Sequence, residues 1–391
     1  MNTALSEHCE KNDTALQSCP TRSRKEELRS LNITHIVGAR PNFMKIAPIM
    51  AELESRDRFN QSLIHTGQHY DHGMSGTFFR ELGIPEPDLD LGVGSGSHAR
   101  QTAAVMEAFE PVLQEKKPEL MVVVGDVNST LACALVAAKM HVRVAHVEAG
   151  LRSGDRSMPE EINRILTDQL ADLLLTPSPD GDRNLLREGI PSKRIFRVGN
   201  IMIDSLRRNL DRARGTGALE KFRVEAGGFV LVTLHRPSNV DEEEQLGEIF
   251  DALAGLAEER PVLFPMHPRT RKSAESFRLM PRLGSVRALE PIGYHEMLSL
   301  MENSSLVLTD SGGIQEETTA LGVPCLTLRD TTERPITVTE GTNTLVPVRT
   351  KEAILRAAAG AGEKRGRIPD LWDGRTAKRI ADVFQKWAHG G

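Results

Sequence analysis

The stretch from residue 306 to residue 317 reads Leu-Val-Leu-Thr-Asp-Ser-Gly-Gly-Ile-Gln-Glu-Glu and decides the fold. Its apolar start predicts a strand, and residues 316–321, behind the two glycines, predict a helix. Glycines between a strand and a helix let backbone N–H groups approach an anion, and the positive helix end favours a diphosphate there. Glu317, one turn into the helix, is placed to accept hydrogen bonds from a ribose. The stretch predicts a nucleotide-diphosphate site, although Ser311, Gly312 and Gly313 alone also fit an ordinary loop.

The same strand-then-helix order repeats on both sides of this stretch, which predicts parallel strands joined by crossover helices. The expected strands are 34–37, 62–65, 120–124, 143–147, 172–175, 195–198, 229–233, 262–265, 286–289, 306–309 and 325–328. The expected helices are 44–55, 74–82, 98–116, 129–140, 160–170, 242–259, 294–302, 316–321 and 375–388. The continuous apolar run at 121–124 is typical of a strand buried on both faces.

The length of 391 residues indicates two domains. Residues 208–217 are rich in charge and glycine and are expected to serve as a linker. We predict an α/β fold with two Rossmann-like domains that face a central cleft, where ligands bind beyond the carboxyl ends of the strands. The expected boundaries are 1–30 for a flexible N-terminal extension, 31–204 for the first domain, 205–372 for the second, nucleotide-binding domain, and 373–391 for a helix that packs back on the first.

Composition excludes several classes of protein. The apolar fraction of 39% and charged fraction of 26% fit a soluble globular protein, and a net charge of -5 argues against a nucleic-acid partner. No apolar run is long enough to span a bilayer or to form the core of a signal peptide, so no membrane partner is expected. Cys9, Cys19, Cys133 and Cys325 are widely spaced, which indicates reduced thiols and a cytoplasmic location.

Two further patterns are weak. His65, His69 and His72 have helical spacing, but the glycines among them indicate a loop, so we expect no metal site. The glycines at 92, 94 and 96 have the wrong spacing for a dinucleotide fingerprint and follow a poor central strand.

Cationic residues follow the first strand. Gly38-Ala39-Arg40-Pro41 comes directly after it, and Lys45 lies inside the next helix. A glycine turn with Arg40 and Lys45 at a helix start suits phosphate binding. A plain loop with solvated cations is the alternative.

Three acids lie at strand or helix ends of the first domain. Asp126 and Glu148 each follow a buried strand, and Glu160 begins a helix behind Pro159. Helix capping is the alternative for Asp126, and ordinary helix-dipole stabilisation is the alternative for Glu160. Because these ends converge at one edge of the sheet, the three acids form a cluster that could remove and return a proton on carbon.

The second domain supplies cations at the ends of its strands. His235 and Arg236 follow the strand at 229–233, where they could neutralise charge on a departing diphosphate. His267 follows the next strand, and Arg334 belongs to a polar loop, Asp-Thr-Thr-Glu-Arg-Pro, at 330–335.

In this order the motifs resemble the non-hydrolysing UDP-N-acetylglucosamine 2-epimerase family. The resemblance spans nearly all of residues 33–346. The motifs that carry it are Gly38–Pro41 with Lys45, Thr66–His69, Gly125-Asp126, His146–Arg152, Pro159–Arg164, Leu234–Arg236, Asp310–Glu317 and Asp330–Pro335. It implies a glycosyltransferase-B type of fold, a homodimer, hinge closure and no cofactor. It also implies anti elimination of UDP to a 2-acetamidoglucal and re-addition of UDP with C2 inverted.

Carried over by motif, the resemblance gives each candidate a role. Asp126, Glu148 and Glu160 would be the acid/base cluster, and His235 would assist departure of UDP. Arg40 and Lys45 would reach the nucleotide from the first domain. The diphosphate would lie on Ser311, Gly312 and Gly313 and the ribose on Glu317, with Arg334 near the phosphates or sugar and Arg236 and His267 as further substrate contacts.

The chain departs from the family pattern at several positions. Pro237-Ser238-Asn239 follows His-Arg where an acid and Asn are common, Ile336 replaces a common Glu, and Met297 stands where an aromatic often flanks uracil. The loop at 68–71 leaves activation by a second substrate molecule open.

Four other functions stay open at this point. A hydrolysing relative would release free sugar, and a related epimerase would use a UDP-2,3-diacetamido sugar. A glycosyltransferase or a non-catalytic nucleotide-sugar binding protein would leave the three acids without a role.

Overall fold

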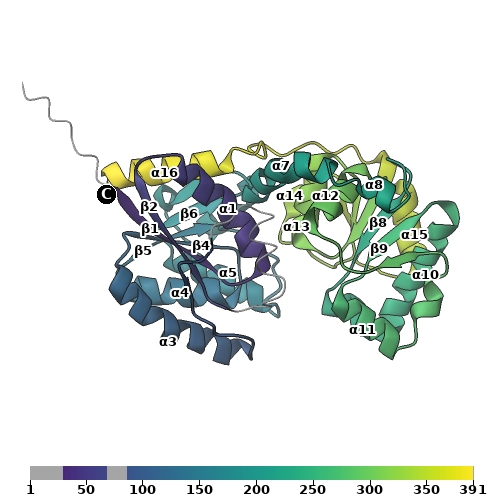
Figure 1. Cartoon of the computed structure of the whole chain (residues 1–391), viewed down its shortest axis with the longest axis horizontal. Coiled ribbons are helices and arrows are strands. Elements are labelled where there is room, and N and C mark those ends of the chain that lie inside the picture. The colour runs from purple at the N-terminus through teal and green to yellow at the C-terminus, as the bar shows by residue number, and fades with distance from the viewer. Residues whose placement is uncertain (1–29, 68–85, 391) are drawn as a thin grey trace, which may run out of the picture.

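A computed structural model describes residues 30–67 and 86–390 of the chain, with the side chains of residues 40, 389 and 390 excepted. It consists of two α/β domains that lie side by side (Figure 1). Each is built on a parallel sheet, in the order β3-β2-β1-β4-β5-β6-β7 in the first and β10-β9-β8-β11-β12-β13 in the second. In both sheets the strand order reverses beside the first strand in sequence, which is the doubly wound Rossmann arrangement. The predicted α/β fold with two Rossmann-like domains is confirmed.

The strands are β1 Leu31–Val37, β2 Phe59–His65, β3 Leu89–Asp90, β4 Leu120–Val124, β5 Arg143–Val147, β6 Leu173–Thr176, β7 Ile195–Arg197, β8 Val230–Thr233, β9 Val262–Pro265, β10 Arg287–Leu289, β11 Leu306–Thr309, β12 Cys325–Thr327 and β13 Asn343–Leu345. The helices of the first sheet are α1 Arg40–Glu54, α3 His98–Lys116, α4 Asn128–Lys139, α5 Pro159–Leu170 and α6 Pro179–Arg187. The later helices are α7 Ile201–Arg214, α8 Ala218–Lys221, α9 Pro237–Val240, α10 Glu243–Glu259, α11 Pro268–Ser276, α12 Tyr294–Asn303, α13 Gly312–Leu321, α14 Pro335–Thr339, α15 Lys351–Gly360 and α16 Thr376–Gly390.

The central strand of the first sheet shows why the fold is layered. All five residues of β4 are buried, and they alternate between two separate cores. Leu120, Val122 and Val124 pack on one face of the sheet, and Met121 and Val123 pack on the other. Such a strand must be covered by helices on both sides, as the sequence predicts.

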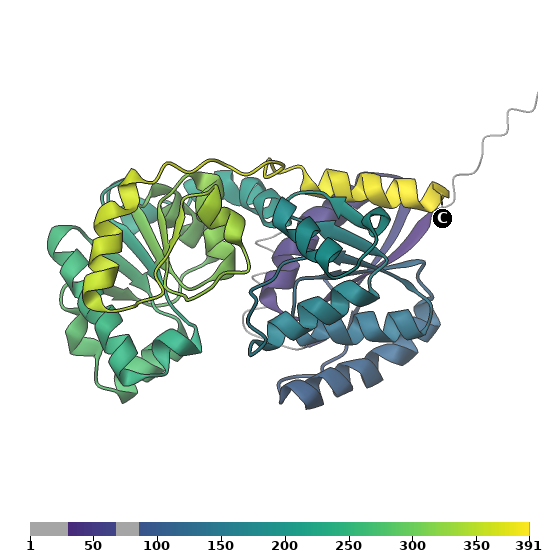
Figure 2. The same ribbon diagram turned by 180° about the vertical axis from the view of Figure 1, so that it is seen from behind.

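The chain passes between the domains twice. It leaves the first domain through α7 and returns through the segment before α16, which lies along the first domain (Figures 1 and 2). Ile380 and Phe384 of α16 are buried in the core of that domain. Both carboxylate oxygens of Asp204 on α7 accept hydrogen bonds from the backbone N–H groups of Thr376 and Ala377, at 3.1 and 2.8 Å. Asp204 therefore caps the N-terminus of α16 and links the two segments, α7 and the start of α16, at which the chain passes between the domains.

The structure corrects two expectations about elements. Helix α13 begins at Gly312 rather than at residue 316, so both glycines lie in its first turn. Most of the expected linker at 208–217 is helix, because α7 runs to Arg214 and buries one face, and the expected boundary at 204/205 falls inside this helix. As expected of a poor central strand, residues 87–91 contribute only β3, a two-residue strand at the edge of the sheet.

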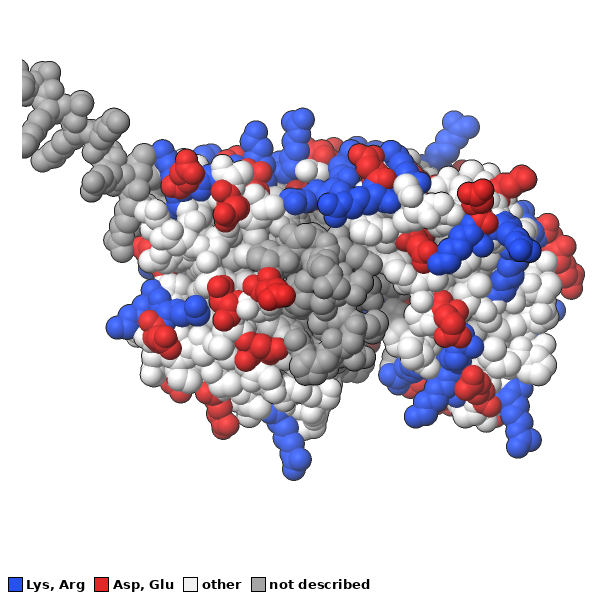
Figure 3. Space-filling view, in the orientation of Figure 1, with Lys and Arg blue, Asp and Glu red and all other residues white. Residues whose placement is uncertain are grey.

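The expected extension at 1–30, apart from residue 30, and the expected helix at 74–82 lie outside the described residues. Among the residues the structure describes, none of the helices is both long and apolar enough to cross a membrane. On the face of the molecule in Figure 3, acidic and basic side chains are interspersed.

Candidate active site

Two acids lie at the carboxyl ends of neighbouring strands, and one of them has an unusual backbone conformation. Asp126 follows Gly125 at the end of β4, and Glu148 directly follows β5. Glu148 has a φ of 69°, in the left-handed region that non-glycine residues seldom adopt. Such a conformation costs about 1–2 kcal/mol. Strain of this kind is typical of functional positions, because the surrounding structure must hold the residue in place.

Glu148 is buried and paired with a lysine. The Lys45 ammonium, on α1, forms a short ion pair and hydrogen bond with Oε2 of Glu148, and both side chains are more than 90% buried. The other carboxylate oxygen, Oε1, is buried and has no hydrogen-bond partner among the described residues. Lys45 thus holds Oε2 of Glu148 in place, while Oε1 retains its capacity to accept a hydrogen bond. The expected contact of Lys45 with a nucleotide stays a prediction.

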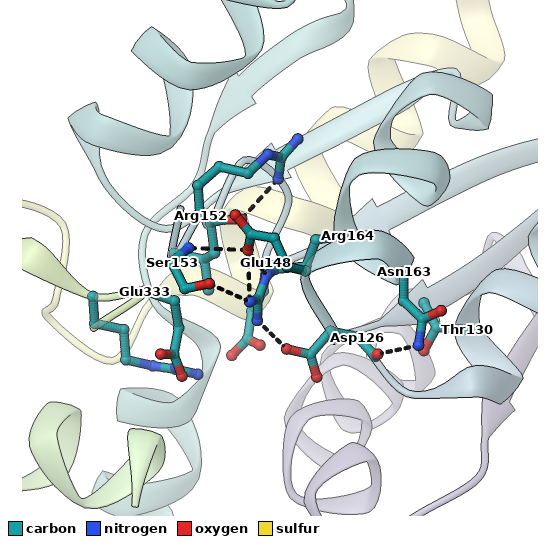
Figure 4. Close-up of polar contacts among 12 residues, drawn as sticks. Asp126, Thr130, Glu148, Arg152, Ser153, Asn163, Arg164 and Glu333 are labelled. Carbon is teal, nitrogen blue, oxygen red and sulfur yellow. Dashed lines mark hydrogen bonds and ion pairs between the residues drawn. The ribbon is translucent and has the colours of Figure 1, made fainter. Parts of the chain in front are cut away.

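Asp126 is held by the first turns of α5 (Figure 4). Its Oδ2 lies 2.5 Å from Nη1 of Arg164, and its backbone carbonyl accepts a hydrogen bond from Asn163 at 2.9 Å. The side chain is 30% exposed. The N-cap of α4 is Val127, so capping by Asp126 does not account for this carboxylate.

Glu160 and its neighbour Glu161 have different surroundings. Glu161 is buried and accepts hydrogen bonds from the N–H groups of Ser153 and Gly154 and from Arg164, so it fixes the loop before α5. Glu160 is partly exposed in the first turn of the helix. Burial lowers the pKa of Arg236 in the second domain. The negative charge of Glu160 is one of those that partly offset this effect. Glu160 therefore faces the second domain.

His235 is supported by a buried carboxylate. Oδ1 of Asp310, which follows β11, lies 2.9 Å from Nδ1 of His235. Asp310 also accepts hydrogen bonds from the backbone N–H groups of His235 and Arg236. Burial raises the pKa of Asp310, but the bonds and charge of His235 lower it below its ordinary value. The carboxylate therefore orients the imidazole and leaves Nε2 for another partner, since the His235 side chain is 41% exposed.

His267 stands beside this pair. Its ring centroid lies 5.7 Å from that of His235, and its Nδ1 accepts a hydrogen bond from the backbone N–H of Arg269 at the start of α11. Burial, followed by the charge of His235, lowers the pKa of His267. A neutral His267 beside His235 suits contact with a polar ligand rather than charge neutralisation.

The first turn of α13 has the form of an anion site. Ser311 is the N-cap and makes no side-chain capping bond. A Cβ atom at Gly312 would lie 2.6 Å from Nη1 of Arg334, so the approach of this arginine requires glycine. A Cβ atom at Gly313 would meet only the methyl group of Met202, at 3.9 Å. The chain itself therefore tolerates a side chain at Gly313, while a bound phosphate would need that space.

Arg334 is the centre of a buried ionic cluster. Its Nε lies 2.8 Å from Oε1 of Glu316, and its Nη1 pairs closely with Glu333. Burial lowers the pKa of Arg334, but four carboxylates raise it: Glu316, Glu333 and, from the first domain, Glu148 and Asp126. The two domains therefore contribute to one electrostatic site.

Arg329 is part of the same cluster. Its Nη2 donates to Glu333 at 2.8 Å, and its Nη1 is buried with no hydrogen-bond partner among the described residues. A buried, unused guanidinium N–H group suits an anionic ligand.

Glu317 is buried in α13 and bonded to a tyrosine. The hydroxyl of Tyr294 donates to its Oε1 at 2.8 Å. Burial raises the pKa of Glu317 to about 7, an effect that the Tyr294 bond partly offsets. One carboxylate oxygen of Glu317 thus accepts a hydrogen bond from Tyr294, and the other, Oε2, can accept a hydrogen bond from a ligand.

Two expectations concern residues at the limit of the described chain. Arg40 is the first residue of α1, and its side chain is not among those described. His69 and His72 lie outside the described residues, and within those residues no group of three or more His, Cys, Asp or Glu side chains could hold a metal.

Sequence reasoning missed Asp310, Arg329, Glu333, Arg164 and Tyr294 as parts of the site. For Asp310 the signal was present, because it ends a buried strand in the same way as Asp126. Arg164 and Tyr294 contact site residues 38 and 23 positions away, so no local pattern marks them, and the close pairs of Arg329 and Glu333 do not by themselves distinguish a site from a surface ion pair.

Comparison with known proteins places the chain in a family. The family profile for UDP-N-acetylglucosamine 2-epimerase matches residues 51–385. A UDP-N-acetylglucosamine 2-epimerase of Methanocaldococcus jannaschii is 42% identical over 362 residues, which cover 90% of this chain and 99% of the relative. A UDP-2,3-diacetamido-2,3-dideoxy-D-glucuronate 2-epimerase of Pseudomonas aeruginosa is 41% identical over 360 residues, 91% of this chain and 100% of the relative.

The fold agrees with solved structures of these enzymes. The crystal structure of the M. jannaschii UDP-GlcNAc 2-epimerase in complex with UDP-GlcNAc and UDP superimposes with a TM-score of 0.83 at 42% identity. The match covers 91% of this chain and 100% of that chain. The resemblance in sequence motifs is therefore confirmed, and the chain belongs to the UDP-N-acetylglucosamine 2-epimerase family.

Proposed function

We propose that this protein epimerises UDP-N-acetylglucosamine at C2 to give UDP-N-acetylmannosamine. One observation carries the proposal: three carboxylates of the first domain, Asp126, Glu148 and Glu160, face the cationic groups that surround the α13 N-terminus of the second. Proton transfer at carbon needs the carboxylates, and a departing diphosphate needs the cationic groups. Membership of the family, at 42% identity to an epimerase over 99% of its length, supports the same reaction.

The reaction proceeds in two balanced steps. A carboxylate removes the C2 proton, the C2–H electron pair becomes a C1=C2 double bond, and the C1–O bond breaks with its electrons on UDP. The intermediate is a 2-acetamidoglucal. UDP then adds back at C1 while a proton reaches C2 from the opposite face, so acids on more than one side of the sugar are required.

Glu148 is the strongest candidate for the proton-transfer residue next to the sugar. Its Oε1 is unsatisfied and buried, and its strained backbone holds it in one position. His235, oriented by Asp310, assists departure of UDP through Nε2. Asp126 and Glu160 complete the acid cluster.

The second domain holds the nucleotide. The diphosphate binds at the positive end of α13, on Ser311, Gly312 and Gly313. Glu317 accepts hydrogen bonds from the ribose hydroxyls. Arg334, Arg236 and His267 complete the contacts of the second domain, and Arg40 and Lys45 contribute from the first.

A second substrate has support of its own. The P. aeruginosa relative, named for a UDP-diacetamido-glucuronate, is nearly as similar as the UDP-GlcNAc epimerase, at 41% against 42% identity. A UDP-2,3-diacetamido sugar with a C5 carboxylate is therefore the alternative substrate. The same elimination and re-addition would occur at its C2.

Separate incubation with the two UDP-sugars, followed by anion-exchange chromatography and NMR of the products, tests the proposal. UDP-N-acetylmannosamine from UDP-N-acetylglucosamine is the expected result. Turnover of only the diacetamido sugar would establish the alternative. Free N-acetylmannosamine with UDP would show a hydrolysing enzyme, and transfer to an acceptor without epimerisation would contradict the reaction type.

The proposal extends to assembly and location: the family resemblance suggests the first, and the cysteines suggest the second. We expect a homodimer in the cytoplasm, where the buried thiols of Cys133 and Cys325 stay reduced. Sedimentation equilibrium tests the dimer, since a mass near 43.1 kDa at all concentrations would contradict it. Fractionation of the source cells tests the location.

A further inference from the structure

A fully buried ion pair lies beneath Asp126 and Glu148 in the first domain. His146 on β5 and Asp168 on α5 both have side chains with no exposed surface, and His146 Nδ1 lies 2.6 Å from Asp168 Oδ1. The other ring nitrogen, Nε2, lies 2.8 Å from the backbone carbonyl oxygen of Gly125. Neither residue is expected to contact a UDP-sugar, so the proposed chemistry gives them no direct role.

Both contacts of His146 require a donor from the ring. A carboxylate and a carbonyl oxygen only accept hydrogen bonds, and a neutral imidazole carries one N–H group. Both bonds form only when the imidazole is doubly protonated. The other oxygen of Asp168, Oδ2, accepts the N–H of Gly150 at 3.0 Å and pairs with Arg152 at 2.8 Å, so Asp168 is surrounded by donors that favour its charged, accepting form.

The charges of the surrounding network balance. Arg152 Nη1 lies 2.8 Å from Asp168 Oδ2, and Arg152 also pairs with Glu188 at 2.6 Å. Two cations and two anions therefore give a neutral group. A buried imidazolium is sustained under these conditions, since each charge has a partner.

The pair connects the turns that carry the two acids. His146 binds the carbonyl of Gly125, one residue before Asp126, while Asp168 Oδ2 accepts the N–H of Gly150 at 3.0 Å, two residues after Glu148. Gly125, Glu148 and Gly150 all have positive φ angles, of 69°, 69° and 81°. The two glycines adopt these angles readily, but Glu148 does not, so the turn at Glu148 depends on surrounding contacts to hold an unfavourable backbone conformation.

We propose that His146, as a buried imidazolium, and Asp168 are positioning residues that fix Asp126 and Glu148 relative to each other. The inference rests on the proposed epimerase reaction, in which both carboxylates act on one sugar carbon. Displacement of either acid by about 1 Å would lower turnover on the order of 100-fold. Nucleotide binding, which belongs to the second domain, would change little.

The charge state is tested without reference to activity. Nitrogen-15 NMR of the full-length protein labelled in histidine, with His146→Gln for assignment, reports the protonation of each ring nitrogen. Both ring nitrogens of His146 are expected to carry a proton in the folded protein, because each faces a hydrogen-bond acceptor. A neutral His146 ring at pH 7 would overturn the inference, whatever the activity.

Positioning is tested by two substitutions that each keep one bond. His146→Asn can retain the donor to Asp168, and His146→Gln can retain the donor to Gly125. Each is expected to lower kcat on the order of 100-fold, with KM and the Kd of UDP changed less than about twofold. The matched control is His35→Gln, because His35 is also fully buried in this sheet but bonds Gln61, at 2.9 Å, away from both turns.

The outcomes separate this inference from the proposed function. An inactive wild-type protein would contradict the epimerase reaction. An active wild type whose His146 variants keep their kcat would contradict only the positioning role. A parallel loss in kcat, KM and UDP affinity, shared by His35→Gln, would indicate general destabilisation and would also overturn it.

Discussion

At the scale of the residue, Glu148 combines three features that seldom coincide. It is charged, it is more than 90% buried, and it has a φ of 69°. Each feature costs free energy, and the structure stabilises the residue through Lys45 and through the turn beneath it. The sequence predicts the position of Glu148, because a carboxylate directly behind a buried strand is exceptional. It does not predict the left-handed backbone, since no local pattern requires it.

The backbone strain at Glu148 gives a stability prediction. Glu148→Gly and Glu148→Ala remove the same carboxylate and leave the same unpaired Lys45, but only glycine adopts a φ of 69° without strain. We expect Glu148→Gly to be more stable than Glu148→Ala by about 1 kcal/mol in urea unfolding. A glycine variant that is the less stable of the two would show that the turn relaxes and carries no strain.

Glu317 gives a prediction about pH. Its pKa is raised to about 7, so this carboxyl gains a proton as the pH falls from 8 to 6 and loses acceptor capacity for the ribose. The KM for the UDP-sugar, whose diester phosphates do not titrate in this range, should therefore rise as the pH falls. Tyr294→Phe removes the bond that lowers this pKa, and it should shift the midpoint to higher pH. A KM that is constant from pH 6 to 8 would contradict the role of Glu317.

The same group affects the stability of the free protein with the opposite sign. A carboxyl whose pKa is raised on folding, here from 4.5 to about 7, binds its proton more tightly in the folded state. Its contribution to stability is complete below about pH 4.5 and is lost as the pH rises through 7. Comparison of unfolding curves for the wild type and Glu317→Gln between pH 5 and 8 measures this contribution.

At the scale of the element, α13 shows what a strand–glycine–helix pattern predicts. The pattern correctly places a helix after β11, but the helix begins four residues earlier than expected. Glycine is a poor helix former in helix interiors, and the prediction treated Gly312 and Gly313 as loop for that reason. In a first turn the backbone N–H groups have no helical partner, so glycine there costs less and leaves these groups open to a ligand.

The two glycines of α13 are expected to respond differently to alanine. Gly313→Ala adds a methyl group that meets only Met202, at 3.9 Å, so stability should be unchanged or slightly higher, while the Kd for UDP should rise on the order of tenfold. Gly312→Ala places its methyl group 2.6 Å from Arg334 and should lower stability as well. Calorimetric titration with UDP and thermal unfolding measure both effects. Unchanged UDP affinity in Gly313→Ala would contradict a diphosphate at this helix end.

At the scale of the whole molecule, the sequence predicts the two sheets and the edge at which the candidate site residues gather. Parallel strands joined by helices leave few topologies, and chemically active residues at strand ends must then gather at one edge. It does not predict which of these residues pair. Lys45 and Glu148 are 103 positions apart, and Arg334 responds to carboxylates of the other domain. The first contact depends on how α1 packs on the sheet and the second on how the domains face each other, and no local pattern encodes either.

The central claim is that the carboxylates of the first domain exchange a proton at C2 of a UDP-sugar held by the second. Incubation of the wild type and Glu148→Gln with UDP-N-acetylglucosamine in deuterated water, followed by proton NMR, tests it most directly. We predict UDP-N-acetylmannosamine with deuterium at C2 from the wild type. Glu148→Gln should bind UDP normally and turn over about 100- to 10,000-fold more slowly. An epimer that keeps its original C2 proton, or a Glu148→Gln variant with undiminished turnover, would contradict the account.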